Sequence, residues 1–235
     1  VNPRASRTVP FVCKATGEPL AKIAARVMVG QTMKQQGVKV EVTPKYMCVK
    51  EAVFPFTKFL GVDPVLGPEM RSTGEVMGVG ASFGEALYKA ELGAGDRLPE
   101  KGTAFISVRD VDKARAVSVA THLRDQGFNI VATRGTAALL QHAAIPCRVV
   151  NKVSEGRPNV VDMIKNGDVQ LVIATADESR TQISDARQIR QTALAQLGVV
   201  YYTTISGAAA AVEGQKHAKD VEVRSLQELH AMNRA

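Results

Sequence analysis

Residues 104–132, AFISVRDVDKARAVSVATHLRDQGFNIVA, decide the fold of this chain. They contain a short apolar run (104–108), a helix-forming stretch (112–126) that Gly127 ends, and a second apolar run (128–132). Short apolar runs rich in β-branched and aromatic residues are typical of buried strands. A strand, a helix and a second strand in this order predict a βαβ unit with parallel strands.

The same alternation continues to residue 203. Gly and Pro, which break both helices and strands, separate several of its segments. Strands that alternate with helices predict an α/β fold, a doubly wound, Rossmann-like parallel sheet with helices on both faces. The further predicted elements are a helix that ends over 141–144, strands over 148–150 and 169–174, a helix over 180–197 and a strand over 199–203.

Polar residues follow the predicted strands, at the edge where such a fold binds its ligands. Several of them precede predicted helices, whose first amide groups and dipoles attract anions. The same hydroxyls also cap helices, so none of them establishes a site alone. Together they favour a phosphate pocket, and the candidates are Ser107–Lys113, Thr133-Arg134-Gly135-Thr136, Asn151-Lys152, Thr175-Ala176-Asp177, Thr203-Thr204 and Ser206-Gly207.

Residues 93–102 separate this α/β region from an earlier unit. They are polar and carry three glycines and one proline without an apolar period, which is typical of a linker. We therefore expect two units, residues 1–92 and residues 103–235. The length of 235 residues, which exceeds the usual size of one domain, agrees with this division.

The earlier unit contains an unusual stretch, residues 61–80, with five glycines and two prolines. Such a density of helix and strand breakers, mixed with reactive polar residues, predicts a shaped functional loop rather than a regular element. After this stretch, Ser82 and Glu85 have the spacing of a capping box. We expect the helix that begins there to end at Gly93.

Two further elements are predicted nearer the start of the chain. Apolar residues at helical spacing over 19–28 predict a helix that faces the core. Residues 46–53 are predicted to form a strand. Within it, Glu51 is either a charged residue at the edge of a sheet or a residue of a functional site, and the spacing alone favours the first alternative. Arg4 and Arg7 either bind a phosphate through charge-assisted hydrogen bonds or lie in a solvated turn.

Composition narrows the classes of function. The chain has 30 basic and 23 acidic residues, a formal net charge of +7, but 5% aromatic residues and no Trp, so nucleic-acid binding rests on net charge alone. No apolar run approaches the about 20 residues that cross a bilayer, and no signal peptide is evident. The cysteines lack disulfide or metal spacing and indicate a reducing, cytoplasmic location; they are Cys13, Cys48 and Cys147.

The run Pro68-Glu69-Met70-Arg71-Ser72-Thr73-Gly74-Glu75-Val76-Met77-Gly78 closely resembles the segment that closes the second ATP-grasp unit of carbamoyl-phosphate synthase large chains. The resemblance covers essentially the whole chain, with long and specific motifs. It extends back to Asn2-Pro3-Arg4-Ala5-Ser6-Arg7-Thr8 and forward through Asn151-Lys152 and Glu155-Gly156-Arg157-Pro158. It implies that a carboxyl-terminal fragment begins with the end of an ATP-grasp domain and continues, from residue 103, as a methylglyoxal-synthase-like allosteric domain.

The resemblance also implies roles for single residues. Asn2 looks like the metal-binding Asn of the second ATP site, and Arg4 like its catalytic, phosphate-side arginine. The positions that match an allosteric site for a nucleotide monophosphate are Ser107, Lys113, Thr133, Thr136, Lys152 and Thr175. The positions that match a site for the activator ornithine are Glu51, Tyr201 and Thr203.

The sequence departs from the family pattern at both allosteric sites. Ala174 and Ala176 stand where the best-known bacterial enzymes carry Asn and Thr, which removes two polar side chains from the nucleotide site. Tyr202 replaces an expected Asp near the ornithine positions. We therefore expect altered control by both effectors.

The implied enzyme is a glutamine-hydrolysing ligase that makes carbamoyl phosphate from bicarbonate, ammonia and ATP, with Mg²⁺ or Mn²⁺, for pyrimidine and arginine synthesis. Its implied partners are the upstream part of the large chain, a glutamine amidotransferase small subunit and further copies in a higher homo-oligomer, with no nucleic acid and no membrane. UMP or IMP is the implied effector, and we expect this chain alone to be inactive. The alternative is a freestanding methylglyoxal-synthase-type lyase with Asp177 as its base, although residues 184–190 follow the synthase pattern.

Overall fold

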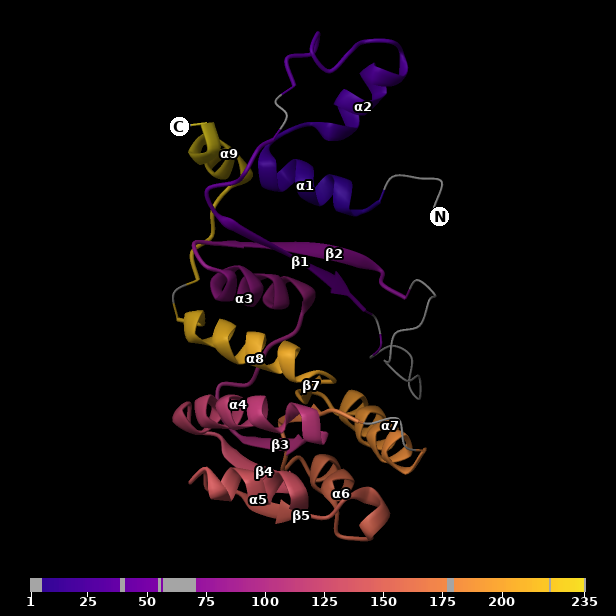
Figure 1. Ribbon diagram of the computed structural model, residues 1–235, viewed down its shortest axis with the longest axis vertical. Helices are drawn as coiled ribbons and strands as arrows, with labels where there is room; N and C mark the ends of the chain where they lie inside the picture. Colours follow the sequence, from indigo (N-terminus) through magenta and orange to yellow (C-terminus); the bar gives the residue numbers. More distant parts are fainter. Residues whose placement is uncertain are drawn as a thin grey trace.

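The structure is a computed structural model that describes residues 6–38, 41–54, 56, 71–176, 180–219 and 221–234, with the backbone alone at 180–182 and 234. Two regions follow one another along its long axis (Figure 1). One contains a small antiparallel sheet and the first three helices, and the other a five-stranded sheet. The last helix returns to the first region, beside α1.

The five-stranded sheet is entirely parallel, in the order β5-β4-β3-β6-β7. From the central strand β3 the chain builds outward to one side and then returns to build the other. The crevice between the ends of β3 and β6 is therefore the point where such a fold binds ligands. The strands, which confirm the five predicted ones, are β3 (Thr103–Ser107), β4 (Asn129–Thr133), β5 (Arg148–Val150), β6 (Leu171–Ala174) and β7 (Val200–Tyr202).

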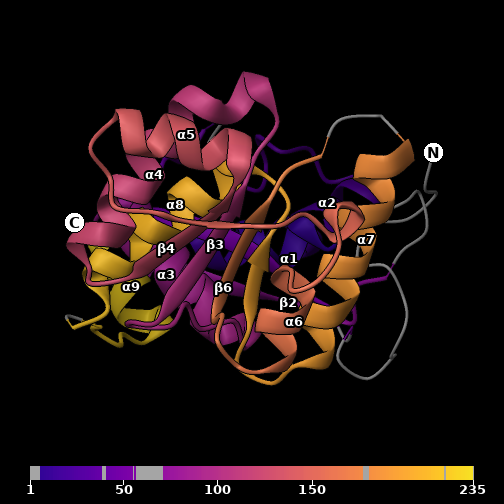
Figure 2. The ribbon, with the colours of Figure 1, turned by 90° about the horizontal axis from the view of Figure 1, so that it is seen from below.

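Helices cover both faces of this sheet (Figure 2). Alternate side chains of β3 point to opposite faces: Ile106 packs with α4, α5 and α8, whereas Phe105 packs with α6 and α7. Both apolar clusters are fully buried at these strands, so the predicted doubly wound fold is confirmed. The helices are α4 (Lys113–Asp125), α5 (Arg134–His142), α6 (Val160–Lys165), α7 (Arg180–Ala195) and α8 (Ile205–Gly214).

The first region contains two antiparallel strands, β1 (Met47–Val53) and β2 (Gly74–Gly80), covered by α3 (Phe83–Ala94). The strand predicted over 46–53 is confirmed. The prediction of an irregular loop is wrong for 74–80, which form β2, and residues 61–70 lie outside the described residues. Gly78 and Gly80 of β2 serve packing, because a Cβ atom on Gly78 would overlap the carbonyl oxygen of Ala86 in α3 and one on Gly80 would overlap Glu85.

The predicted start of α3 is confirmed with one change. Ser82 Oγ accepts a hydrogen bond from Glu85 N at 3.2 Å, as an N-cap should. The carboxylate of Glu85, however, accepts from Ala81 N at 2.8 Å, one residue before the N-cap. The helix continues past Gly93 and ends at Ala94, where Gly95 adopts a left-handed conformation with φ 92°.

Two helices precede this sheet: α1 (Thr8–Thr16) and α2 (Leu20–Met28). The prediction of a core-facing helix over 19–28 is right about the helix and wrong about the core. No residue of α2 is buried, and Met28 is 86% exposed. The apolar spacing is real, but α2 has its described contacts with α1, which leave Val27 and Met28 exposed.

The two regions are in direct contact. Helix α8 and the short helix η4 (Gln215–His217) pack against α3. The predicted linker is partly enclosed, because Leu98 is buried in the core of the parallel sheet and Gln215 Nε2 donates to the carbonyl of Pro99 at 2.6 Å. The last helix, α9 (Leu226–Arg234), packs against α1, where His230 Nε2 lies 2.8 Å from the carbonyl oxygen of Lys14.

Candidate functional site

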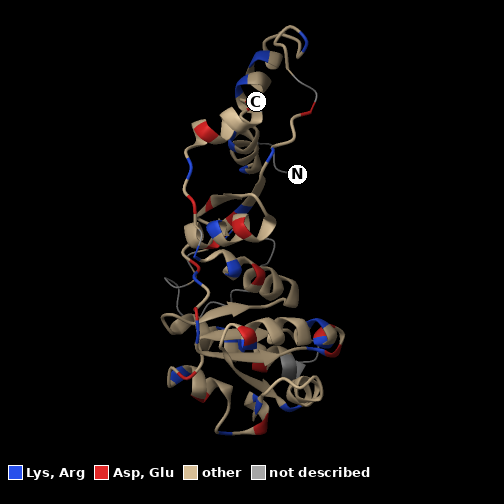
Figure 3. Ribbon diagram, turned by 90° about the vertical axis from the view of Figure 1, so that its left-hand side faces the viewer, with Lys and Arg blue, Asp and Glu red and all other residues tan. Residues whose placement is uncertain are grey.

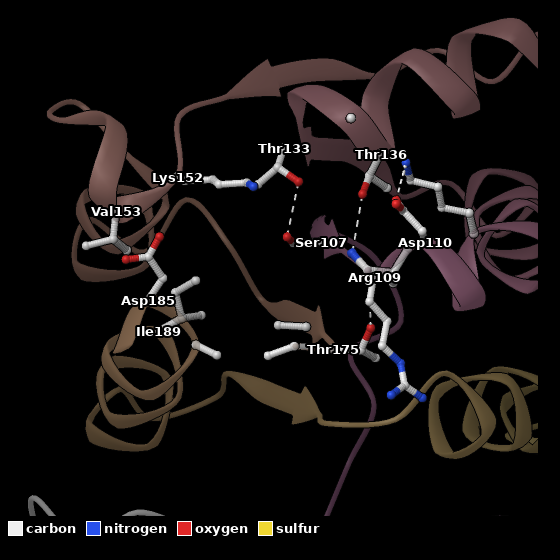
Figure 4. A pocket seen from close by; sticks show the side chains of 16 residues that line it. Ser107, Arg109, Asp110, Thr133, Thr136, Lys152, Val153, Thr175, Asp185 and Ile189 are labelled. Atoms are coloured by element: carbon white, nitrogen blue, oxygen red, sulfur yellow. Dashed lines mark hydrogen bonds and ion pairs between the residues drawn. The ribbon is translucent and has the colours of Figure 1, made fainter. Parts of the chain in front are cut away.

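A cavity of about 160 Å³ opens at the carboxyl ends of β3, β4 and β6 (Figure 4). It lies at the crevice that the strand order predicts as the ligand site. All six residues predicted for the nucleotide site line it: Ser107, Lys113, Thr133, Thr136, Lys152 and Thr175. Residues from four separate segments of sequence therefore converge on one place.

The hydroxyl groups of the pocket are fixed to one another and to the backbone. Ser107 and Thr133 end adjacent strands, and their Oγ atoms lie 3.1 Å apart. Thr136 Oγ1 accepts from Val108 N at 3.3 Å, and Thr175 Oγ1 accepts from Arg109 N at 3.0 Å. The hydroxyl of Thr136, which accepts from the backbone, keeps its own proton to donate and can offer a hydrogen bond to an anion, whereas the hydroxyl of Thr175 donates to Asp112.

Two lysines reach the pocket from different segments. Lys113 is the first residue of α4, and Lys152 immediately precedes the short helix η3 (Val153–Glu155). Figure 4 shows the side chain of Lys152 extending toward Thr133. A Cβ atom on Gly135 would lie 3.8 Å from Lys113 Nζ, so this ammonium group lies beside the first turn of α5. Positive charge, helix amides and hydroxyls together form an environment suited to phosphate.

Two acidic residues at the pocket, the lining residue Asp110 and its neighbour Asp112, are paired with cations. Asp110 Oδ1 lies 2.7 Å from Lys113 Nζ, and this hydrogen bond and the charge of Lys113 lower the pKa of Asp110. Burial acts to raise the pKa of Asp112, but hydrogen bonds from Arg109 and Thr175 lower it overall. Arg109 Nε lies 2.7 Å from Asp112 Oδ2. These carboxyl groups are therefore ionised at neutral pH.

The sequence prediction missed Asp185 and Ile189 as lining residues. Both are in α7, four residues apart and therefore on one helix face. Asp185 Oδ2 accepts from Ser154 Oγ at 2.7 Å and from Ser154 N at 3.3 Å, which ties η3 to α7 beside Lys152. The spacing of the helix that follows β6 places them on one face but does not show that this face turns toward the pocket.

The residues after β7 do not line this pocket. Thr204 instead caps α8, its side chain accepting from Gly207 N at 3.1 Å. Ser206 Oγ accepts from Arg115 Nη1 at 2.8 Å and joins the first turns of α8 and α4. Thr203 is exposed. Two of the predicted strand-end segments, Thr203-Thr204 and Ser206-Gly207, thus have local roles in the described structure.

A second polar group lies where α3 meets β7. Tyr202 Oη and Glu91 Oε1 of α3 lie 3.2 Å apart. Burial, together with the negative charges of Glu51 and Asp96, raises the pKa of Glu91 to about 7, although the hydrogen bond from Tyr202 lowers it. Burial and the charge of Asp96 also raise the pKa of Glu51. We call these four residues, Glu51, Glu91, Asp96 and Tyr202, the carboxylate contact.

The three residues predicted for ornithine lie in different settings. Glu51 belongs to the carboxylate contact. Tyr201 packs on the opposite face of the sheet, with the apolar cluster of α6 and α7. Alternation along β7 therefore turns Tyr202, the residue that departs from the family pattern, toward the carboxylates. The sequence prediction missed Glu91 and Asp96, which α3 and the turn after it bring beside Glu51.

The predicted ATP-site residues Asn2 and Arg4, like the candidate base Asp177, lie outside the described residues. Among the described residues of the first region, Arg7 Nη1 donates to Ser72 Oγ at 3.3 Å, and Lys50 Nζ donates to Thr8 Oγ1 at 3.1 Å. In the described part of the chain, no three His, Cys, Asp or Glu side chains converge as a metal site. None of the described helices has the length and apolar character to cross a membrane.

Basic and acidic residues are interspersed along both regions (Figure 3). Comparison with known proteins is more specific than this distribution of charged residues. Residues 115–203 match the family model of the MGS-like domain. The whole chain is 64% identical over 231 residues to the carbamoyl phosphate synthase large chain of Ralstonia nicotianae.

Other relatives agree. The carbamoyl phosphate synthase large chains of Pseudomonas aeruginosa and Pasteurella multocida are 58% identical over 231 residues and 55% identical over 230 residues. Each match covers 98% of this chain and 21% of the relative, so the chain spans about a fifth of the length of these relatives. The resemblance seen in the sequence is confirmed: the chain belongs to the carbamoyl phosphate synthase large-chain family and carries an MGS-like domain.

Proposed function

We propose that this chain is the carboxyl-terminal, regulatory part of a carbamoyl phosphate synthase large chain, and that its strand-end pocket binds a nucleotide monophosphate as effector. One observation carries the proposal. The six residues assigned to a nucleotide site from sequence resemblance all line a single cavity in the fold. Their chemistry, two lysines and four hydroxyl groups beside helix N-termini, suits a phosphate group.

Titration calorimetry with UMP and IMP on the purified chain tests the proposal. Uridine and inosine, which lack the phosphate, serve as matched ligands. We expect UMP or IMP to bind at least tenfold more tightly than its nucleoside, because a phosphate held by charged donors contributes about 1.5 to 3 kcal/mol. Absence of binding by both nucleotides, or equal binding of nucleotide and nucleoside, would place the effector site elsewhere.

The synthetic reaction belongs to the same proposal. The full-length enzyme would use glutamine-derived ammonia, bicarbonate and ATP with Mg²⁺ or Mn²⁺, and Asn2 and Arg4 would contribute to its second ATP site. The hydrogen bond from Arg7 to Ser72 supports this placement, because it joins the segment after Arg4 to the run before β2 that resembles the family motif. We expect no ATP synthesis from carbamoyl phosphate by this chain alone, measured by a coupled assay, because one Asn and two arginines cannot hold Mg²⁺-nucleotide.

The carboxylate contact favours a second ligand class, an amine such as ornithine. Carboxyl groups from β1, α3 and the turn after α3 lie close enough to raise one another's pKa. A cationic amine would offset that repulsion. Calorimetry with ornithine, compared with Glu51→Gln, tests the assignment of Glu51, Tyr201 and Thr203 to this site. Unchanged binding in Glu51→Gln would remove Glu51 from it.

The remaining assignments follow from the family. They include a cytoplasmic enzyme, an amidotransferase small subunit, a higher homo-oligomer and a role in pyrimidine or arginine synthesis. The division at 93–102 is tested by limited proteolysis, which should leave a stable product that begins near residue 103. Random cleavage throughout the chain would argue against two units. The freestanding lyase gains no support, since the similarity to large chains includes the residues before 103.

A further inference from the structure

In the described structure the phosphate-site lysine Lys113 is paired with a carboxylate of the same pocket. Asp110 Oδ1 and Lys113 Nζ are 2.7 Å apart, and both residues line the cavity. Figure 4 shows Asp110 beside Thr136. The pocket therefore contains an anion of its own at one of the cations that a phosphate would use.

The second lysine acts on the same carboxylate. The positive charge of Lys152 contributes to the lowered pKa of Asp110, after the larger effects of Lys113. The two lysines come from opposite sides of the pocket, one from α4 and the other from the segment before η3. Asp110 is thus close enough to Lys113 and Lys152 to compete with an anionic ligand for their positive charges.

The geometry also lets Asp110 move away. Its backbone belongs to a short helix, η2 (Asp110–Asp112), whose base is held by the Arg109–Asp112 ion pair and by the bond from Arg109 N to Thr175 Oγ1. Its side chain is 90% exposed, whereas that of Lys113 is 31% exposed. A rotation of the Asp110 side chain can therefore free the lysine without a change in the turn.

We infer that Asp110 is an internal competitor of the effector phosphate: it holds Lys113 in the empty pocket and must release it when a phosphate enters. This inference rests on the proposed nucleotide site. The competition lowers affinity for every anion, because the ligand must replace an existing ion pair and then lie near a like charge. A dianionic phosphate offsets that cost better than a single negative charge.

An opposite role for Asp110 gives an opposite result. If its carboxylate accepted a hydrogen bond from the ribose or the base, its removal would weaken nucleotide binding. The sign of the change in affinity therefore decides between the two. The substitution Asp110→Asn keeps the shape of the side chain, removes the charge and replaces one acceptor oxygen with an amide NH2 group.

The experiment is titration calorimetry of UMP and IMP with the whole chain, as wild type and Asp110→Asn, at low and high salt. The matched control is Asp125→Asn, the same charge change at the far end of α4, where Asp125 pairs with Arg124. We expect Asp110→Asn to bind about twofold to fivefold more tightly at low salt, the range of an exposed ion pair. The gain should shrink at high salt, and Asp125→Asn should bind as the wild type does.

The outcomes separate this inference from the proposed function. If the wild type binds and Asp110→Asn binds equally or more weakly, the inference is wrong and the nucleotide site stands. If Asp125→Asn gains as much, the effect comes from net charge, which also overturns the inference. If the wild type binds neither nucleotide, the proposed site is wrong, and the inference with it. Thermal unfolding of each variant verifies that the fold is unchanged.

Discussion

The strand-end pocket and the carboxylate contact are both polar, but their charges are balanced in opposite ways. At the pocket, the lining residue Asp110 and its neighbour Asp112 each have a cation at 2.7 Å, and the pKa values of both are lowered. In the contact, Glu91 accepts a hydrogen bond from the uncharged phenol of Tyr202 and lies near the carboxyl groups of Glu51 and Asp96, and its pKa is raised to about 7. The two sites therefore differ in how their carboxylates are compensated. Those at the pocket are neutralised by cations, whereas those of the carboxylate contact repel one another.

The largest expected effect lies in the pocket. Lys152→Ala removes one of its two lysines and should weaken UMP or IMP binding by roughly tenfold to a hundredfold, because a charged hydrogen bond contributes about 1.5 to 3 kcal/mol. Titration calorimetry measures the change. Lys165→Ala, which removes the same charge at the exposed end of α6, is the matched control. Equal losses in both variants would show that only overall charge matters there.

The pocket was the more predictable of the two sites. In a doubly wound fold the residues that follow the parallel strands all lie at the same edge of the sheet. Strand positions and family motifs were therefore enough to assign Ser107, Thr133, Lys152 and Thr175. Asp185 and Ile189 could not, since the end of β6 does not fix which face of α7 turns inward. The roles of the residues after β7 could not be predicted either, because a hydroxyl there can cap a helix rather than line the pocket, as Thr204 does.

The carboxylate contact could not be predicted beyond Glu51. Glu91 lies in helical sequence, where a solvated charge is the ordinary expectation. It is enclosed because β1, β2 and α8 pack against α3 and Tyr202 of β7 contacts it. The fold shows the same limit. Local patterns identified the elements of the parallel sheet, whereas the packing glycines of β2 were read as loop residues and the exposed face of α2 as a core face.

The next effect concerns stability and pH. Because the pKa of Glu91 is raised in the folded state from 4.5 to about 7, protonated Glu91 favours folding, and this stabilisation is lost as pH rises through about 7. Glu91→Gln, which stays neutral, should therefore gain about 1 to 2 kcal/mol over the wild type between pH 6 and pH 8. Urea unfolding at the two pH values measures this difference.

Tyr202→Phe sharpens the same measurement. The hydrogen bond from Tyr202 lowers the pKa of Glu91, so its removal should raise that pKa further and extend the loss of stability to higher pH. A Glu91→Gln variant whose stability follows that of the wild type at both pH values would contradict the description of the contact. It would mean that Glu91 is ionised in the folded protein without cost.

The smallest effect returns to the pocket and to the two alanines that depart from the family pattern. Both line the cavity, but Ala174 is 6% exposed and belongs to the apolar cluster of α6 and α7, whereas Ala176 is half-buried. A hydroxyl added by Ala176→Thr can reach the ligand while it remains partly solvated. It should tighten UMP or IMP binding by about twofold to tenfold, the value of one net hydrogen bond.

Ala174→Asn is the informative contrast, because its amide would enter an apolar cluster. We expect that variant to lose stability by about 1 to 3 kcal/mol, the cost of a buried polar group without a partner, and to gain less affinity than Ala176→Thr. Calorimetry and thermal unfolding of both variants decide the matter. Tighter binding by Ala174→Asn with unchanged stability would show that residue 174 turns toward the ligand, and that the end of β6 offers the effector a polar position which this chain leaves unused.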